Sequence, residues 1–549
     1  MPSTIADIPV EVFLDNIVLY LSARDLLSLG SVNRAFHLIT SDETLWHRKL
    51  QADYNFSGSD TARTTGWKFI YQRLSNPEVY VWGESSNSRL GLGEVIPRSS
   101  IHREGVPFPV HLRLPNANII SLVAGGMSFH ALDSKGNLHV WGVLDGTSFG
   151  YRNEGFSEPS MTSPVPIRLE LPAPIRSVSC GRLHAAALDS TSTNSPETTP
   201  IQVECGWSFT AILMQTSDVL VYWPRKGRIY EAIKTTKRHL DEHDSNSKAY
   251  VKDGVVPCHC WDLKGINPVQ LPPIPAEELP ELPGTGPTDE TRFQRTKLVR
   301  IAGMDNYIIG LTNKGHVLCY SMLNGEDTYQ QGRWHYLPWF SELEKVKQLP
   351  PLAASEGHLE LPQFMQITHI TAHFQTFVAY STGSQSVVLM RKISTEEPLP
   401  TSLEELQPTL IPELQYKSVI SVVVGDYHYG ALTSTGRLFT WGAFSKGALG
   451  LGDPVKIAVG EPGGFSSQDD REVAENAHGW MAVEPPEVEV PTEVRFDHEL
   501  ERSRETYCFA VAAAGWHMGA LIIGLEKDDK FERPTVPYSP LLCTPFCHL

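Results

Sequence analysis

A phrase that recurs about seven times constrains the fold of this 549-residue chain more than any other feature. Its clearest copy, residues 419–452, holds an apolar strand ending at a glycine turn, a second strand with Ala431-Leu432, and a third strand ending in Trp441-Gly442. The small-plus-apolar pair marks the other copies, at Ala131-Leu132, Ala187-Leu188, Ala211-Ile212, Gly310-Leu311, Ala379-Tyr380 and Ala520-Leu521. A strand beginning with proline often follows, and four short strands per copy predict the blades of a β-propeller.

The spacing of the copies predicts one degenerate blade. Ala131 and Ala187 are 56 residues apart and Ala379 and Ala431 are 52 apart, and we read the longer gaps as this unit plus insertions. Only 24 residues separate Ala187 from Ala211, and the polar run 190–200 stands where outer strands would be. This blade is either short by about two strands, or a piece of the sequence is missing there.

The two ends of the repeat region predict how the ring closes. Trp82-Gly83 has no anchor strand before it, and the last anchor strand, within 509–525, has no Trp-Gly after it. Each is half a blade, and a ring that pairs its ends leaves fewer exposed strand edges. We therefore expect residues 77–93 to complete the blade begun near 493–525.

Residues 5–52 have a helical pattern instead. Apolar residues recur on one helical face, at Val10, Leu14, Ile17, Val18 and Leu21, and Ser22 to Asp25 reads as a capping box for a second helix. So short a unit cannot bury all of its apolar surface alone. It is either a small bundle packed on the rest of the chain, with Trp46 and Phe36 in its own core, or a docking module whose surplus apolar face belongs to a partner.

The composition of the chain argues against several classes of protein. The net charge of −17 disfavours nucleic-acid binding, and eight cysteines in a chain of this length do not form a disulfide scaffold. No apolar run reaches the ~18 residues that span a membrane. The N-terminal apolar stretch contains acids and has no basic flank, so it is not a secretory signal. We expect a cytoplasmic or nuclear protein, or both, with no membrane and no nucleic-acid partner.

Three insertions are candidates for partner contacts. They span 224–297, 321–364 and 453–492, and the last is acidic. They are either solvated loops or segments that grip a protein at one rim of the ring. Aromatic side chains dominate many interfaces, and one insertion holds a cluster of them. The candidate substrate-binding residues are therefore Trp334, Tyr336, Trp339 and Phe340.

The sequence predicts no metal site, cofactor or catalytic centre. His184, His428 and His517 occupy one repeat position, which favours hydrogen bonding at turns over metal binding. Cys258-His259-Cys260 has no second ligand pair to complete a zinc site. Neither a phosphate-binding loop with its lysine nor a Gly-x-Ser-x-Gly elbow appears.

Two family resemblances sharpen this reading. The helical segment resembles an F-box, which binds the Skp adaptor of Skp–cullin–F-box ubiquitin ligases. The residues that match are Ile8-Pro9-x-Glu11, Ile17, Leu21, Asp25-Leu26, Val32-Asn33-Arg34, Phe36 and Leu45-Trp46. The repeat resembles that of the regulator of chromosome condensation, a seven-bladed propeller, since Trp-Gly precedes Gly-Leu-Gly within both 82–93 and 441–452. The combination resembles the fungal SCF-associated-factor type of F-box protein.

These resemblances imply a small all-α F-box module followed by an all-β seven-bladed propeller with one degenerate blade and long loop insertions. We expect an F-box at 1–60, a linker at 61–76, the propeller at 77–530 and a tail at 531–549. The implied adaptor-binding residues are Ile8, Pro9, Leu14, Ile17, Leu21, Leu26, Val32 and Trp46.

The implied function is a non-catalytic substrate receptor of a ubiquitin ligase. The F-box would hold the Skp adaptor and through it a cullin, and the propeller would hold a protein substrate for degradation. The alternatives are a guanine-nucleotide exchange factor for a small GTPase, which the propeller family includes, and a non-catalytic scaffold.

Overall fold

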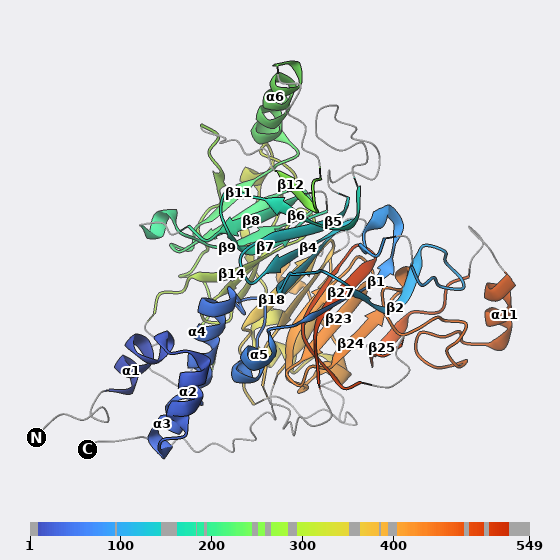
Figure 1. The fold of residues 1–549 in the computed structure, drawn as a ribbon. Helices are drawn as coiled ribbons and strands as arrows, with labels where there is room; N and C mark the ends of the chain where they lie inside the picture. The colour runs from blue at the N-terminus through green and yellow to red at the C-terminus, as the bar shows by residue number, and fades with distance from the viewer. Residues whose placement is uncertain are drawn as a thin grey trace, which may run out of the picture.

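The computed structural model joins a helical N-terminal region to a ring of β-sheets (Figure 1). The structure describes residues 9–93, 96–143, 162–182, 184–191, 195–243, 251–257, 265–283, 294–350, 363–383, 386–393, 403–476, 483–498 and 504–525.

Short helices with polar caps build the N-terminal region. They are α1 (Val10–Asn16), the 3-10 turn η2 (Val18–Tyr20), α2 (Ala23–Gly30), α3 (Arg34–Ile39) and α4 (Glu43–Tyr54). The Ser22 hydroxyl accepts the backbone N–H of Asp25 at 3.2 Å and donates to its carboxylate at 2.7 Å, which confirms Ser22 as the N-cap of α2. Asn33 and Asp42 cap α3 and α4 in the same way. Helix α4 ends at Asn55, whose φ of 55° turns the chain toward the ring.

Six sheets of four or five strands form most of the ring. In the order of their hydrogen bonding, the first two are β2-β1-β27-β26 (Gly105–Leu112, Glu78–Glu84, His517–Gly524, Thr506–Ala514) and β12-β6-β5-β4-β3 (Val255–Pro257, Thr162–Glu170, Leu138–Val143, Ser128–Asp133, Ile119–Gly125). The next two are β13-β11-β10-β9 (Val269–Gln270, Val219–Tyr222, Thr210–Met214, Pro200–Cys205) and β14-β15-β16-β17 (Leu298–Gly303, Ile308–Thr312, Val317–Tyr320, Trp334–Tyr336). The last two are β18-β19-β20-β21 (His369–His373, Thr376–Tyr380, Val388–Lys392, Thr409–Leu410) and β22-β23-β24-β25 (Val419–Val424, His428–Thr433, Leu438–Gly442, Val488–Glu493).

The expectation of seven blades needs a correction, because six blades are complete. Between the β3 and β9 sheets lies a two-stranded sheet of β7 (Ile175–Cys180) and β8 (Ala185–Asp189). Its inner strand still packs between its neighbours, since β7 contacts both β3 and β9. Only ten residues separate β8 from β9, which leaves no length for two outer strands, and a seventh sheet is therefore present only in its inner half.

The predicted closure of the ring is confirmed. Strand β1 pairs antiparallel with β27, with Tyr80 opposite Ala520 and Trp82 opposite Met518. The same strand pairs on its other side with β2, so residues from both ends of the repeat region share one sheet. Trp82 is fully buried there, and its indole N–H donates to the carbonyl of Ala448 at 2.8 Å.

The insertions carry helices as well as loops. Helix α6 (Gly227–His243) and helix α11 (Gln468–Asn476) project from different sides of the ring (Figure 1). The second insertion, 321–364, contains α8 (Pro338–Ser341) and α9 (Leu343–Val346), which pack on the β14–β17 sheet.

Candidate functional site

Exposed apolar side chains are concentrated in the N-terminal helices. Among the described residues, 14 large apolar side chains are more than a third exposed; five fall within residues 12–38 and the other nine are scattered over 165–490. We call the five the N-terminal apolar residues. They are Val12 at 46% exposed, Tyr20 at 85%, Leu27 at 50%, Val32 at 65% and Leu38 at 63%. Such a concentration is typical of a surface that a protein partner covers.

The predicted adaptor-binding residues lie at different depths. Ile8 falls outside the described residues. Pro9 and Val32 are exposed, and Leu14, Ile17 and Leu21 are half-buried. Leu26 and Trp46 are fully buried in the core, so they support the surface from beneath. The indole N–H of Trp46 donates to the carbonyl of Thr40 at 2.8 Å.

Four of the N-terminal apolar residues were missed by the sequence reading. Val12, Tyr20, Leu27 and Leu38 stand beside the helical face that the apolar spacing marks, rather than on it. The signal that could have found them is the excess of apolar residues over one helical stripe, because a helix can bury only one stripe against its own core.

The N-terminal helices and the ring share one hydrophobic core. Helix α5 (Trp67–Arg73) follows α4 and places Phe69 against Tyr507, with ring centroids 4.8 Å apart. Phe56 lies 6.4 Å from Phe509 in the same way. The segment that we expected to be a linker, 61–76, thus contains a packed helix.

A buried arginine reinforces this junction. The guanidinium of Arg63 donates to the Tyr507 hydroxyl at 2.6 Å and to the carbonyl of Ser434 at 3.4 Å. Arg63 is only 5% exposed, and Tyr507 in turn donates to Ser434 at 2.9 Å. Low exposure keeps solvent from competing for these bonds, so they hold the helical region at a fixed position on the ring.

The loop after α4 covers one mouth of the central channel. The Asn55 side-chain amide donates to the carbonyl of Ile175 at 2.9 Å, and the Ala62 N–H donates to that of Ile420 at 2.6 Å. From a third sheet, Arg300 donates to the carbonyl of Ser59 at 2.6 Å. The channel holds a cavity of about 200 Å³ that residues of all seven inner strands line.

A buried carboxyl group, that of Glu204, lines this cavity together with Asp60. Burial first, and then the negative charge of Asp60, raise its pKa to about 8. Gln202 donates to this group at 2.9 Å and Ser179 at 3.4 Å. Among the described residues, no group of three or more histidine, cysteine, aspartate or glutamate side chains could hold a metal ion beside it. Cys258-His259-Cys260 lies outside the described residues.

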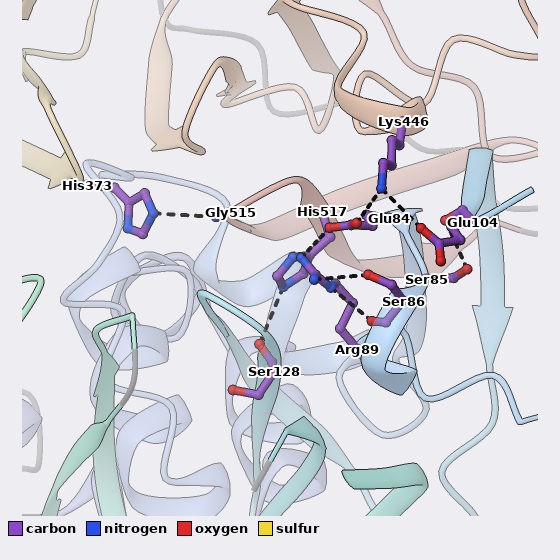
Figure 2. Close-up of polar contacts among 10 residues, drawn as sticks. All are labelled: Glu84, Ser85, Ser86, Arg89, Glu104, Ser128, His373, Lys446, Gly515 and His517. Carbon is purple, nitrogen blue, oxygen red and sulfur yellow. Dashed lines mark hydrogen bonds and ion pairs between the residues drawn. The ribbon is translucent and has the colours of Figure 1, made fainter. Parts of the chain in front are cut away.

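Two of the three repeat-equivalent histidines join neighbouring sheets, as predicted, whereas both ring nitrogens of the buried His428 are without a hydrogen-bond partner among the described residues. The His184 ring bonds the carbonyl of Phe209 at 3.1 Å, and that of His517 bonds the carbonyl of Ser128 at 3.4 Å (Figure 2). Burial lowers the pKa of His184 to about 4 and that of His517 well below its ordinary value. Both rings are therefore neutral at pH 7 and act as hydrogen-bonding struts.

The predicted substrate-binding aromatics are largely part of the blade. Trp334 is 7% exposed and donates to the carbonyl of Pro272 at 2.8 Å, and Phe340 is fully buried against Phe377. Tyr336 and Trp339 are half-buried, with Tyr336 donating to Glu342 at 3.2 Å. A substrate could reach only part of these two rings, and their role in binding stays a prediction.

We expect Arg63→Ala to lower the free energy of unfolding by about 1–3 kcal/mol, because it removes the buried bond between the loop before α5 and strand β26. Thermal melting and the rate of proteolysis between residues 54 and 78 would measure the loss. Arg437→Ala is the matched control, since its ion pair with Glu493 is exposed and should contribute less than about 1 kcal/mol. Equal melting temperatures for the two variants would contradict the proposed rigidity of the junction.

Comparison with known families identifies both parts of the chain. Residues 5–52 match the F-box-like family, and residues 419–448 match the regulator of chromosome condensation (RCC1) repeat. The chain therefore carries an F-box-like domain followed by a propeller with an RCC1 repeat. We refer to residues 5–52 as the F-box-like domain from here on.

The curated relatives divide between the same two classes. SCF-associated factor 1 of Saccharomyces cerevisiae is 38% identical over 109 residues, which is 20% of this chain and only 14% of that protein. Protein RCC1 of Candida albicans is 21% identical over 405 residues, covering 71% of this chain and 74% of the relative. Guanine nucleotide exchange factor SRM1 of Saccharomyces cerevisiae is 33% identical over 85 residues, 15% of this chain and 17% of the relative.

Among solved structures, human WBSCR16 superposes with a TM-score of 0.47 at 15% identity, covering 81% of this chain and 98% of that one. Prp20p of Saccharomyces cerevisiae superposes with a TM-score of 0.40 at 15% identity, covering 85% and 97%. Within the part of the chain that the structure describes, no helix has the length and apolar character needed to cross a membrane.

Proposed function

We propose that this protein is the substrate receptor of a Skp–cullin–F-box ubiquitin ligase. The observation that carries the proposal is the set of N-terminal apolar residues, exposed on an F-box-like domain that is fixed to a propeller. The exposed side chains would dock on the Skp adaptor, and a cullin would join through the adaptor. The similarity to SCF-associated factor 1 supports the same assignment.

In this function the chain positions a substrate and makes no bond itself. A ligase of this kind brings a substrate lysine close to a conjugating enzyme, and the gain comes from proximity and orientation. Such positioning needs a firm connection between the adaptor and the substrate. The shared core of Phe56, Phe69 and Tyr507 and the bonds of Arg63 supply that connection.

The proposal is tested by protein turnover in cells. Deleting the gene should lengthen the half-life of a small set of proteins, and the wild-type chain should restore their decay. A chain with Leu27→Asp and Val32→Asp should fail to restore it, whereas Val490→Asp, an equally exposed change on the outer strand β25, should restore it fully. If both variants restore decay alike, the F-box-like domain is not what connects the chain to degradation.

A second candidate function is nucleotide exchange on a small GTPase. The observation in its favour is the similarity over 405 residues to an RCC1 protein. This second candidate function predicts that the purified chain speeds the release of labelled GDP from small GTPases. If the chain is a non-catalytic scaffold, it should not change nucleotide release, and deleting its gene should not lengthen the half-life of any protein.

A further inference from the structure

The mouth of the channel opposite the F-box-like domain is formed by the turns that follow the inner strands. The loop after α4 meets the first residues of β7 and β22, at Ile175 and Ile420. Those strands run through the channel wall and end at the other mouth. That mouth is therefore the one that the F-box-like domain leaves uncovered.

Backbone hydrogen bonds tie these turns into a collar. The N–H groups of Gly126, Trp207, Asp305 and Asp426 each donate to a carbonyl of the next sheet's turn, with distances of 3.3, 3.2, 2.7 and 2.9 Å. Glycine is needed where the turns approach most closely. A Cβ atom at Gly181 would lie 2.4 Å from the carbonyl oxygen of Gly206, and one at Gly515 would lie 2.6 Å from that of Gly126. The collar is thus a rigid base for the side chains that rise from it.

Three aromatic residues at one repeat position stand on this collar, each with a cation at its ring. The Arg182 guanidinium lies 4.3 Å from the centre of the Trp207 ring. The Lys392 ammonium lies 5.5 Å from the Tyr427 ring, and that of Lys446 lies 5.3 Å from the Trp516 ring. In each pair the cation comes from the preceding sheet, so the arrangement follows the repeat.

The cations of these pairs differ in whether they are already neutralised. Lys446 bonds Glu84 at 2.7 Å and Glu104 at 3.1 Å, and Glu84 also pairs with the buried Arg89 (Figure 2). Arg182 and Lys392 are exposed, and neither has an ion-pair partner within the residues that the structure describes. The charge of Lys392 is therefore available to a ligand, and that of Arg182 is only partly offset by the nearby Asp305 and Asp426.

The two available cations belong to one continuous surface. Trp207 lies against Phe374 with ring centroids 4.7 Å apart, and the next residue, Gln375, accepts the N–H of Ile393 beside Lys392 at 2.6 Å. We call Arg182, Trp207, Phe374, Lys392 and Tyr427 the cation–aromatic arc. Trp207 and Phe374 lie between its two cations, and Tyr427 lies beyond Lys392.

Two acidic groups near the arc, Asp426 and Asp305, interact with the charge of Arg182, and each also has another partner. Asp426 is bonded by the His373 ring at 3.2 Å. The backbone N–H of Asp305 donates to the carbonyl of Phe374, and the Asp305 carboxylate interacts with the charges of both Lys226 and Arg182. The three cations Arg182, Lys226 and Lys392 outnumber these two carboxylates, and the rings of the arc lie beside the cations.

We propose that the cation–aromatic arc binds an acidic segment of a protein substrate, with carboxylates at Arg182 and Lys392 and apolar side chains on the three rings. This inference deepens the proposed function, because it names the substrate-binding surface of the receptor. Charge complementarity selects an acidic segment, and the intervening rings select one that carries apolar side chains. A nucleic acid is less suited, because the chain carries a net charge of −17 and a phosphate backbone needs many cations in a row.

The test uses the full-length chain alone, so its outcome does not depend on adaptor binding. The probe is a fluorescein-labelled 16-residue peptide in which Asp and Glu alternate with Leu and Tyr. A second peptide has Lys in place of each acid, and a third probe is a 16-nucleotide single-stranded DNA. Fluorescence anisotropy at low and at physiological salt gives each affinity.

We expect the acidic peptide to bind the wild-type chain, and Arg182→Glu with Lys392→Glu to weaken it at least about tenfold. The matched control is Arg113→Glu with Lys135→Glu, one arginine and one lysine that are exposed near Ser75 to Pro77 at the junction with α5. This control should bind within about twofold of the wild type. Because all four side chains are exposed, the melting temperatures should agree.

Three results would overturn the inference. They are equal binding of the acidic peptide by the wild type and the arc variant, binding of the lysine peptide as tight as that of the acidic one, and absence of peptide binding at low salt. Tighter binding of the DNA than of the acidic peptide would also overturn it, in favour of a nucleic-acid surface. None of these results bears on whether the F-box-like domain binds an adaptor.

Discussion

Leu27→Asp with Val32→Asp should abolish binding of the purified chain to a Skp adaptor. Both side chains are at least half exposed, so neither is part of the helical core. In an interface, each aspartate would bring an unpaired carboxylate into apolar surroundings. That costs on the order of 2–4 kcal/mol per residue, or about 30- to 1,000-fold in affinity.

The exposure of these residues makes the result interpretable. The variant should melt at the wild-type temperature, since substitutions at exposed positions change stability by about 0.5 kcal/mol or less. Val490→Asp with Ile201→Asp is the matched control, because both are exposed apolar residues on blade strands. Adaptor binding at wild-type strength by the Leu27 and Val32 variant would remove the main support for docking through this surface.

Deleting residues 505–549 should open the ring. The deletion removes β26 and β27, and β1 then loses its pairing with β27 from Glu78 to Gly83. Strand edges without partners favour aggregation. The F-box-like domain should also lose its support, because Tyr507 and Phe509 contact Phe69 and Phe56.

Trp82→Ala probes the same closure more gently. Its indole is fully buried and bonded to Ala448, and replacing a buried tryptophan by alanine costs ~3–5 kcal/mol of the ~5–15 kcal/mol that stabilises a domain. Trp339→Ala is the control, since that ring is only half-buried. Thermal melting and light scattering report both changes. A truncated chain that melts like the full-length protein and stays monomeric would show that the ring does not depend on this closure.

The sequence was informative wherever a local pattern fixes a strand or a cap. The repeated Gly, Ala-Leu and Trp-Gly positions predict the blade strands, and the half-blades at Trp82 and at 509–525 predict the β1–β27 pairing that the structure has. The N-cap at Ser22 follows from local chemistry alone. The number of complete blades could not be predicted in this way, because the gap between Ala187 and Ala211 left the outer strands of the β7–β8 sheet undecided.

The junction could not be read from the sequence. Arg63 meets Tyr507, and Phe56 meets Phe509, across more than 440 residues of chain. No spacing rule connects positions so far apart, and the composition of 61–76 does not separate a tethering loop from a packed helix.

The aromatic stretch 334–340 shows the same limit within one blade. An outer strand and an exposed loop can carry the same residues, and only the pairing of β17 with β16 reveals that Trp334 faces the core. The cation–aromatic arc was missed for the converse reason. Its residues are scattered over 182–427 and meet only because the turns gather around one channel.

The most direct test of the central claim is size-exclusion chromatography with light scattering of the full-length chain mixed with a purified Skp adaptor and the N-terminal part of a cullin. The account predicts one complex with a single copy of each protein, and its loss on Leu27→Asp with Val32→Asp but not on Val490→Asp. A chain that elutes alone, or a complex that survives the Leu27 and Val32 changes, would contradict it.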